Sequence, residues 1–167
     1  MSSLRTYLED DHRLIGTLLA NCTSGKTVDR EAFDALRQRL LRHIGIEEKI
    51  VLTAAREAQG GVSLERARQI RVEHGAIASL LVPTPDLELL EELRALLARH
   101  EPLEEGEGGV YDECERLLGA KVDELAARAR AYPVVPLARA FDGQHTVRTA
   151  QQALESAARM RFGNHDE

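Results

Sequence analysis

Four histidines and two glutamates recur along this chain in an order that favours metal binding. The order is a single histidine, a His-x-x-x-Glu pair, a second single histidine and a second His-x-x-x-Glu pair. The six residues are His12, His43, Glu47, His74, His100 and Glu104. Imidazole nitrogens and carboxylate oxygens in this combination suit iron, manganese or zinc far better than calcium or magnesium.

This order is part of an internal repeat. The segment DHRLIGTLL from Asp11 is matched by EHGAIASLL from Glu73, and RHIGIEE from Arg42 is matched by RHEPLEE from Arg99. The chain therefore contains two copies of one unit, in which an acid-His segment is followed by an Arg-His segment.

The two His-x-x-x-Glu pairs each place a nitrogen and an oxygen on one side of a helix. Residues i and i+4 of a helix project from the same face, one turn apart. Both pairs are in register with the apolar positions of their segments, so we expect them to point into the protein. Burying carboxylates that face each other is costly, and a cation held between them removes that cost.

The elements that must position these residues are predicted to be four long helices. Apolar residues recur at three- and four-residue steps over residues 3–21, from Thr27 or Asp29 to 59, from an N-cap at Ser63 to 82, and from Asp86 onward. Nothing alternates with period two for long, so no strand is predicted. Pro102 and the glycines after it predict a distorted or interrupted helix between residues 101 and 110.

The short connectors favour an all-α fold, an up-down-up-down four-helix bundle over residues 1–118. Residues 119–167 are predicted to form a helical extension that packs on the bundle or at a subunit interface. Further helices are expected at about 111–131 and 144–161, joined by an extended connector at 132–136.

Composition excludes several classes of protein. Only 4% of the 167 residues are aromatic while 43% are apolar, so the core must be built from Leu, Ala, Val and Ile, which suits packed helices. The net charge of −6 argues against nucleic acid or an anionic membrane as the main partner. No segment resembles a signal peptide or a membrane span. The two cysteines, 92 positions apart, favour a reducing, cytoplasmic location.

On these motifs the chain resembles the hemerythrin family, specifically the bacterial hemerythrin-like (HHE cation-binding) domains, over roughly residues 5–118. The resemblance implies two iron ions with a bridging oxide or hydroxide, although zinc or manganese is also possible. It further implies that His12 and His43 bind one ion, that His74 and His100 bind the other, and that two glutamates bridge them. These bridging residues are Glu47 and Glu104.

The chain departs from the oxygen-carrying hemerythrins, which have a fifth histidine one turn from the other histidine of the third helix. Here the one-turn neighbours of His74 are Ile70 and Ala78. The missing ligand implies open coordination positions, and the small residues Gly16 and Ala78 could leave room for a ligand there.

Three functions follow from this resemblance. The first is a di-iron protein that binds or senses oxygen, nitric oxide or peroxide. The second is an enzyme of peroxide disposal or iron–sulfur repair, and the third is a non-enzymatic cation-binding interaction module. The expected partners are a small diatomic ligand or peroxide, with a possible homodimer through the C-terminal helices.

The neighbours of the six candidate ligands are expected to have lesser roles. The tyrosines Tyr7 and Tyr111 could approach the site, but we expect each to pack in the core or at its rim. We expect Arg42 and Arg99 on the surface or in salt bridges. Four acidic residues adjoin the ligands, and each is expected to lie on a solvated face or to accept a hydrogen bond from an imidazole N–H. They are Asp11, Glu48, Glu73 and Glu105.

Overall fold

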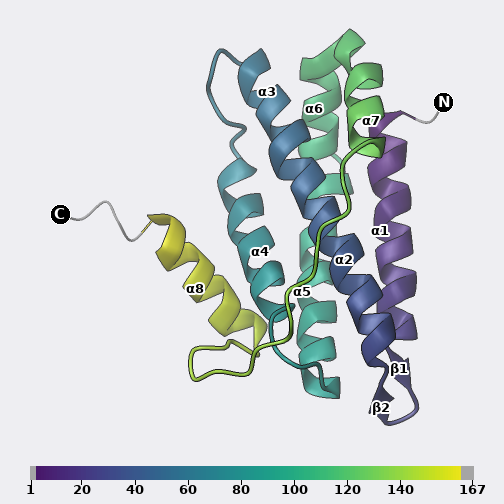
Figure 1. Ribbon diagram of the computed structural model, residues 1–167. Coiled ribbons are helices and arrows are strands. Elements are labelled where there is room, and N and C mark those ends of the chain that lie inside the picture. Colours follow the sequence, from purple (N-terminus) through teal and green to yellow (C-terminus); the bar gives the residue numbers. More distant parts are fainter. Residues whose placement is uncertain (1–2, 163–167) are drawn as a thin grey trace.

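The computed structural model describes residues 3–162, and its helices confirm the predicted all-α fold (Figure 1). Residues 163–167 of the predicted extension lie outside this range. The helices are α1 (Leu4–Asn21), α2 (Arg30–Ile46), the π-helix η1 (Glu47–Val51), α3 (Leu52–Ala58), α4 (Ala67–Leu80), α5 (Leu87–Glu105), α6 (Val110–Leu118), the 3₁₀-helix η2 (Gly119–Lys121), α7 (Val122–Arg130) and α8 (Ala150–Phe162).

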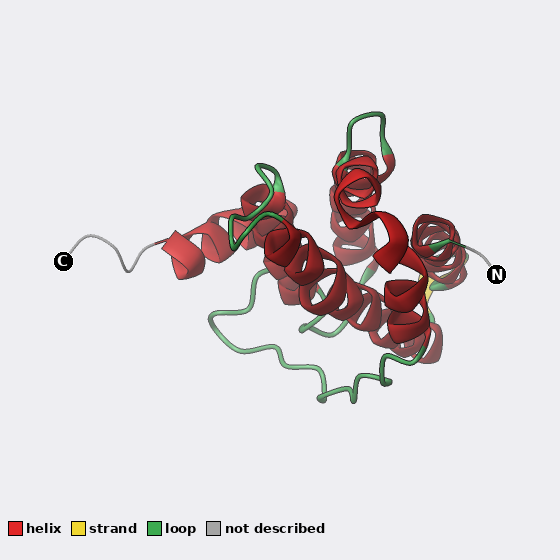
Figure 2. Cartoon of the chain, turned by 90° about the horizontal axis from the view of Figure 1, so that it is seen from above, coloured by secondary structure: helices red, strands yellow, loops and turns green. Residues whose placement is uncertain are grey.

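Four helical rods form the bundle, and each runs opposite to the rod before it in the chain (Figure 1). The rods are α1, the continuous α2–η1–α3, α4 and α5. Viewed from above, α8 lies outside the four rods (Figure 2). Among the described residues, no helix is long and apolar enough to cross a membrane.

Side-chain caps define several helix starts. Asp29 accepts hydrogen bonds from the backbone N–H groups of Glu31 and Ala32, and Asp86 caps α5 in the same way. The prediction that Ser63 caps the third helix is wrong. Helix α4 begins four residues later, at Ala67, because residues 63–64 have no regular structure and residues 65–66 form a turn.

The polar break between the first two helices holds a structure that the sequence did not predict. Strands β1 (Thr23–Ser24) and β2 (Thr27–Val28) pair antiparallel around Gly25, whose φ of 63° is in the left-handed region. Two residues per strand are too few to show an alternating pattern, which is why no strand was expected.

The predicted disruption around Pro102 begins later than expected. Helix α5 runs through this proline to Glu105, and only residues 106–109 interrupt the path to α6. An added Cβ at Gly106 would lie 2.4 Å from the carbonyl oxygen of Pro102, so a side chain does not fit at this turn. The glycines, more than the proline, end the helix.

The C-terminal helices also differ from their predicted ranges. The helix expected at 111–131 is broken at Gly119, where φ is 46°. The last helix begins at Ala150 instead of Gln144. It lies against α4, where a Cβ added to Gly75 would be 3.3 Å from the Cβ of Ala157. Small side chains thus allow α8 to approach α4 closely.

Residues 131–149, here called the strap, cross over α2 without regular structure (Figures 1 and 2). Arg42 anchors the start of the strap, since its guanidinium donates to the carbonyl oxygens of Ala129, Arg130 and Tyr132. The expectation that Arg42 lies on the surface or in a salt bridge is therefore wrong, since its partners are carbonyl groups and the hydroxyl of Tyr7. Only 9% of the residue is exposed, because carbonyl groups of the strap and of α7 cover it.

The apolar core consists of two clusters, one toward each end of the bundle. One contains Leu8, Ile46 and Ile70, and the other contains Ile15, Leu40 and Ile77. Along each of the first three rods, a predicted metal-binding histidine lies between residues of the two clusters. The predicted site is therefore in the middle of the bundle, with apolar packing above and below.

Candidate metal centre

The six predicted ligands converge in the middle of the bundle. Their nitrogen and oxygen atoms form two overlapping groups, and within each group these atoms lie within 4.8 Å of one another. Both groups contain both glutamates, but each has its own pair of histidines. One group is His12, His43, Glu47 and Glu104; the other is His74, His100, Glu47 and Glu104.

Glu47 divides its two oxygens between the histidine pairs. Its Oε1 lies 3.3 Å from Nε2 of His43, and its Oε2 lies 3.2 Å from Nε2 of His74. One oxygen is thus directed to each group, which is the arrangement that a bridging carboxylate requires.

Glu104 is placed in the same way from the opposite rod. Its Oε2 lies 3.4 Å from Nε2 of His12, and its Oε1 lies 3.2 Å from Nε2 of His100. The same Oε1 is 3.4 Å from Nε2 of His74. His74 therefore contacts both glutamates, whereas His12 contacts only Glu104 through its Nε2.

These ligand atoms are buried and poorly satisfied by the protein itself. All six residues are buried, and four atoms of the site have no hydrogen-bond partner among the described residues. Those atoms are Nε2 of His43, Nε2 of His74, Oε2 of Glu47 and Oε2 of Glu104. Unsatisfied buried polar atoms are rare in native proteins, and a bound cation would satisfy all four.

The electrostatics of the metal-free site show the same need for positive charge. Burial opposes a charge on His12, but Glu104 and Glu105 outweigh it and raise its pKa to about 10. Burial and Glu104 both oppose a charge on Glu47, yet His43 and His74 lower its pKa to about 2. Without metal the glutamates are charged and hold protons on the imidazoles, so metal ions would replace these protons.

A second layer of carboxylates fixes the histidine rings. The Nδ1 atom of each histidine faces a carboxylate from the preceding rod of the bundle, so the contacts run once around the four rods. Such contacts set the tautomer and direct Nε2 toward the metal. The four contacts are Asp11 with His43 (3.0 Å), Glu48 with His74 (3.2 Å), Glu73 with His100 (2.9 Å) and Glu105 with His12.

These four carboxylates are the acidic residues that adjoin the ligands in the sequence. Of the two roles predicted for them, the hydrogen bond to an imidazole is confirmed. None bonds to the histidine nearest to it in the sequence; each reaches the next rod instead. Arginines stand behind three of them. Arg39 binds Asp11, Arg161 lies 3.3 Å from Glu48, and Arg99 lies 3.8 Å from Glu73.

The helix geometry changes at the two Glu-Glu sequences, Glu47-Glu48 and Glu104-Glu105. The π-helix η1 begins at Glu47, and the second pair, Glu104 and Glu105, ends α5 just after Pro102. π-Helical turns frequently occur at functional sites. In both halves the first glutamate of the pair reaches the centre and the second reaches a histidine of the next rod.

Tyr111 belongs both to the apolar core, as expected, and to the site itself. Its hydroxyl donates to Oε1 of Glu47 at 2.5 Å and lies 3.5 Å from Nε2 of His12. Burial and the charge of Glu47 raise its pKa well above the usual value, so the phenol keeps its proton. No sequence motif indicates that this tyrosine belongs to the site. The one feature that could have suggested it is its position directly after the interruption at 106–109.

Gly16 does not leave room at the site as the sequence predicted. It is exposed on α1, and no atom lies within 4 Å of a Cβ added there, so it faces solvent instead of the metal ligands. Ala78 is half-buried on α4.

Fold and site together define a helical bundle protein with a buried histidine–carboxylate cation site. The family model of the hemerythrin HHE cation binding domain matches residues 3–131. The chain therefore belongs to the hemerythrin HHE cation-binding family. The match continues past the six-residue pattern to the end of α7. Comparisons with curated proteins and with solved structures gave no significant match.

Proposed function

We propose that this protein holds two iron ions and binds a small ligand, namely oxygen, nitric oxide or peroxide, at them. One observation carries the proposal: both buried glutamates direct one oxygen to each of two histidine pairs. A single ion would need only one of the two overlapping groups. The family match and the buried His/Glu cluster support cation binding in general.

The residues divide by role under this proposal. His12 and His43 would hold one ion, His74 and His100 the other, and Glu47 and Glu104 would bridge them. When bound, iron supplies redox chemistry and coordination positions for a small ligand. The chain itself orients the imidazoles, excludes water and keeps a phenol proton at Tyr111. Both cysteines are free and buried, which fits a reducing cytoplasm.

A small ligand is favoured over a closed structural site because the chain supplies few donors. Four imidazoles and two shared carboxylates leave coordination positions unfilled on two six-coordinate ions. One turn from His74, the structure has Ile70 and Ala78, neither of which can bind a metal.

The test is the optical spectrum of protein loaded with ferrous iron under anaerobic conditions and then oxidised. Adding azide is expected to produce a visible charge-transfer band. A colourless protein that retains only zinc after the same loading would overturn the iron proposal.

Tyr111 favours a second candidate, an enzyme that consumes peroxide. Its hydroxyl lies 3.5 Å from Nε2 of His12, where it could donate a hydrogen bond to a reacting oxygen. Tyr111→Phe is expected to slow peroxide consumption about 10- to 100-fold while iron content stays unchanged. Tyr132→Phe, on the strap, is the matched control and should leave the rate unchanged.

An iron-loaded protein that consumes no peroxide, and whose Tyr111→Phe variant behaves like the parent, would exclude this enzyme. If that protein also gave no band with azide, the remaining function would be a cation-binding interaction module.

A further inference from the structure

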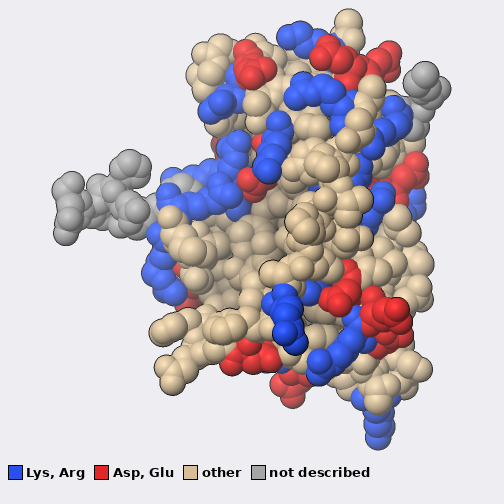
Figure 3. All heavy atoms as spheres, viewed as in Figure 1, with Lys and Arg blue, Asp and Glu red and all other residues tan. Residues whose placement is uncertain are grey.

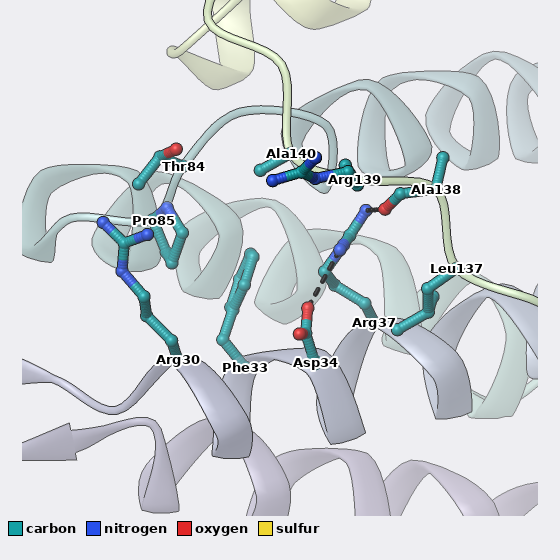
Figure 4. Close-up of a pocket in the computed structure, with 10 residues that line it drawn as sticks. All are labelled: Arg30, Phe33, Asp34, Arg37, Thr84, Pro85, Leu137, Ala138, Arg139 and Ala140. Atoms are coloured by element: carbon teal, nitrogen blue, oxygen red, sulfur yellow. Dashed lines mark hydrogen bonds and ion pairs between the residues drawn. The ribbon is translucent and has the colours of Figure 1, made fainter.

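A cavity far along α2 from the metal centre has a chemistry that the proposed function does not use. It encloses about 420 Å³ between the start of α2, the turn from α4 to α5, and residues 137–140 of the strap (Figure 4). Leu36 and Leu40, both buried, lie along α2 between the cavity and His43. The cavity is therefore separate from the metal ligands.

Arginines dominate the charge of this cavity. Arg30 lines it from α2 and Arg139 from the strap. Neither forms a hydrogen bond or ion pair within the described part of the chain, although the charge of Arg30 helps to lower the pKa of Asp142. Figure 4 shows both side chains extending toward the side of the cavity that Thr84 and Pro85 form. The protein as a whole has a net charge of −6, so two guanidinium groups without an ion-pair partner make this cavity locally positive on a negatively charged protein.

A third arginine is built into the wall. Only 7% of Arg37 is exposed; one of its terminal nitrogens donates to Asp34 at 2.9 Å and the other donates to the carbonyl oxygen of Ala138 at 3.0 Å. Its Nε is buried without a partner. Of the described residues that line the cavity, Asp34 alone is acidic, so three arginines against one aspartate leave a formal charge of +2.

The nearest other carboxylates are already engaged. Asp142 accepts hydrogen bonds from the backbone and the hydroxyl of Thr84, and Asp86 binds Arg148. Arg148 also lies 3.4 Å from Asp142. Basic side chains accordingly gather over the lower part of the strap, beside a group of acidic ones (Figure 3).

The rest of the lining is apolar. Phe33 is buried at the floor, and Pro85 and Leu137 contribute from the turn and from the strap. A ligand that fits this cavity therefore has an anionic end for the two arginines and a small body that tolerates apolar contact. The volume lies within the range of small-molecule sites.

We propose that this cavity binds a small organic phosphate. A phosphate monoester carries a charge of about −1.5 to −2 at neutral pH, which matches the +2 of the lining. Its oxygens suit the fork of a guanidinium, which binds phosphate in a bidentate way. A monocarboxylate would leave one of the two free arginines unpaired.

The test is titration calorimetry of the full, metal-loaded chain with glycerol phosphate, at constant ionic strength. The variant Arg30→Gln/Arg139→Gln removes the two free guanidinium groups, and both positions are exposed, so the fold is expected to persist. The matched control is Arg116→Gln, an exposed arginine on α6. We expect saturable binding by the parent and by the control. We expect the double variant to bind glycerol phosphate with at least tenfold lower affinity.

Three results would overturn the proposal. Binding that the double variant retains unchanged would place the phosphate on the metal ions or elsewhere. Absence of binding heat at constant ionic strength would show that the arginines attract phosphate only through unscreened charge and do not bind it. Tighter binding of succinate than of glycerol phosphate would make the ligand a dicarboxylate. Since the readout is binding at the cavity, none of these results depends on which metal the centre holds.

Discussion

The two histidine pairs of the metal centre come from a repeated sequence, yet they differ in what surrounds them. His12 and His43 lie with ring centroids 4.4 Å apart, and Tyr111 is stacked beside His12. His74 and His100 have centroids 4.9 Å apart and no phenol within hydrogen-bond reach. The repeat thus supplies equivalent ligands, while a residue outside the repeat makes one half different.

Within the half of His12 and His43, the two supporting carboxylates also differ. Asp11 is fully buried and paired with Arg39, whereas Glu105, which holds His12, is one third exposed. Glu105 forms no ion pair with an arginine or lysine among the described residues. His12 is also the most exposed of the four histidines. The half with the phenol is therefore also the half with the least constrained histidine. Under the proposed function, this is the side from which a small ligand is expected to reach the site.

The largest expected effect comes from removing what the halves share. Glu104 contacts three histidines across both pairs, so Glu104→Ala should lose both ions. Metal analysis after gel filtration checks this, with Glu88→Ala on the exposed face of α5 as the control. Full metal content in Glu104→Ala would refute the bridging assignment.

Single histidine variants should separate the halves. His74 contacts both glutamates and His12 only one, so His74→Ala should weaken metal binding more than His12→Ala. Competition with a chelator measures the two affinities. We expect a difference of at least tenfold; equal losses would show that the two halves are energetically equivalent.

Within the half of His12 and His43, the two supporting carboxylates should have smaller and unequal effects. Asp11→Asn is expected to weaken metal binding about 10- to 100-fold, because it leaves Arg39 without its buried partner and His43 without its acceptor. Glu105→Gln should cost less, since water can replace the exposed carboxylate. A larger loss in Glu105→Gln would reverse the comparison.

The smallest difference concerns protons in the metal-free protein. Burial opposes the charge on both rings, but carboxylates raise the pKa of His12 to about 10 and that of His100 to about 9. Each protonated ring therefore stabilises the metal-free fold fully below pH 6.5, and this contribution is lost as the pH rises through 9 and 10. NMR titration of the metal-free chain should show His100 deprotonating before His12. Titration of both rings near 6.5 would contradict this.

The sequence was sufficient to predict which six side chains come together and the rods that carry them. A spacing of four residues places His43 and Glu47 on the same helix face, and likewise His100 and Glu104. The repeat then identifies the remaining two histidines. These relations depend on the helix period alone, so they can be predicted without knowledge of the tertiary structure.

What the sequence could not predict depends on how the rods are arranged around the bundle. The contact of Asp11 with His43, for example, requires knowing which rod neighbours which face. Tyr111 reaches Glu47 only because the chain turns back at residues 106–109 and packs α6 on α3 and α5. Arg42 is buried by a strap with no periodic pattern, so its anchoring role left no signal in its own segment.

The iron content of the anaerobically loaded chain, after removal of excess metal, tests the central claim most directly. If Glu47 and Glu104 bridge two histidine pairs, each chain should retain two iron ions. Retention of a single ion per chain would show that the two overlapping groups form one site and would contradict the account.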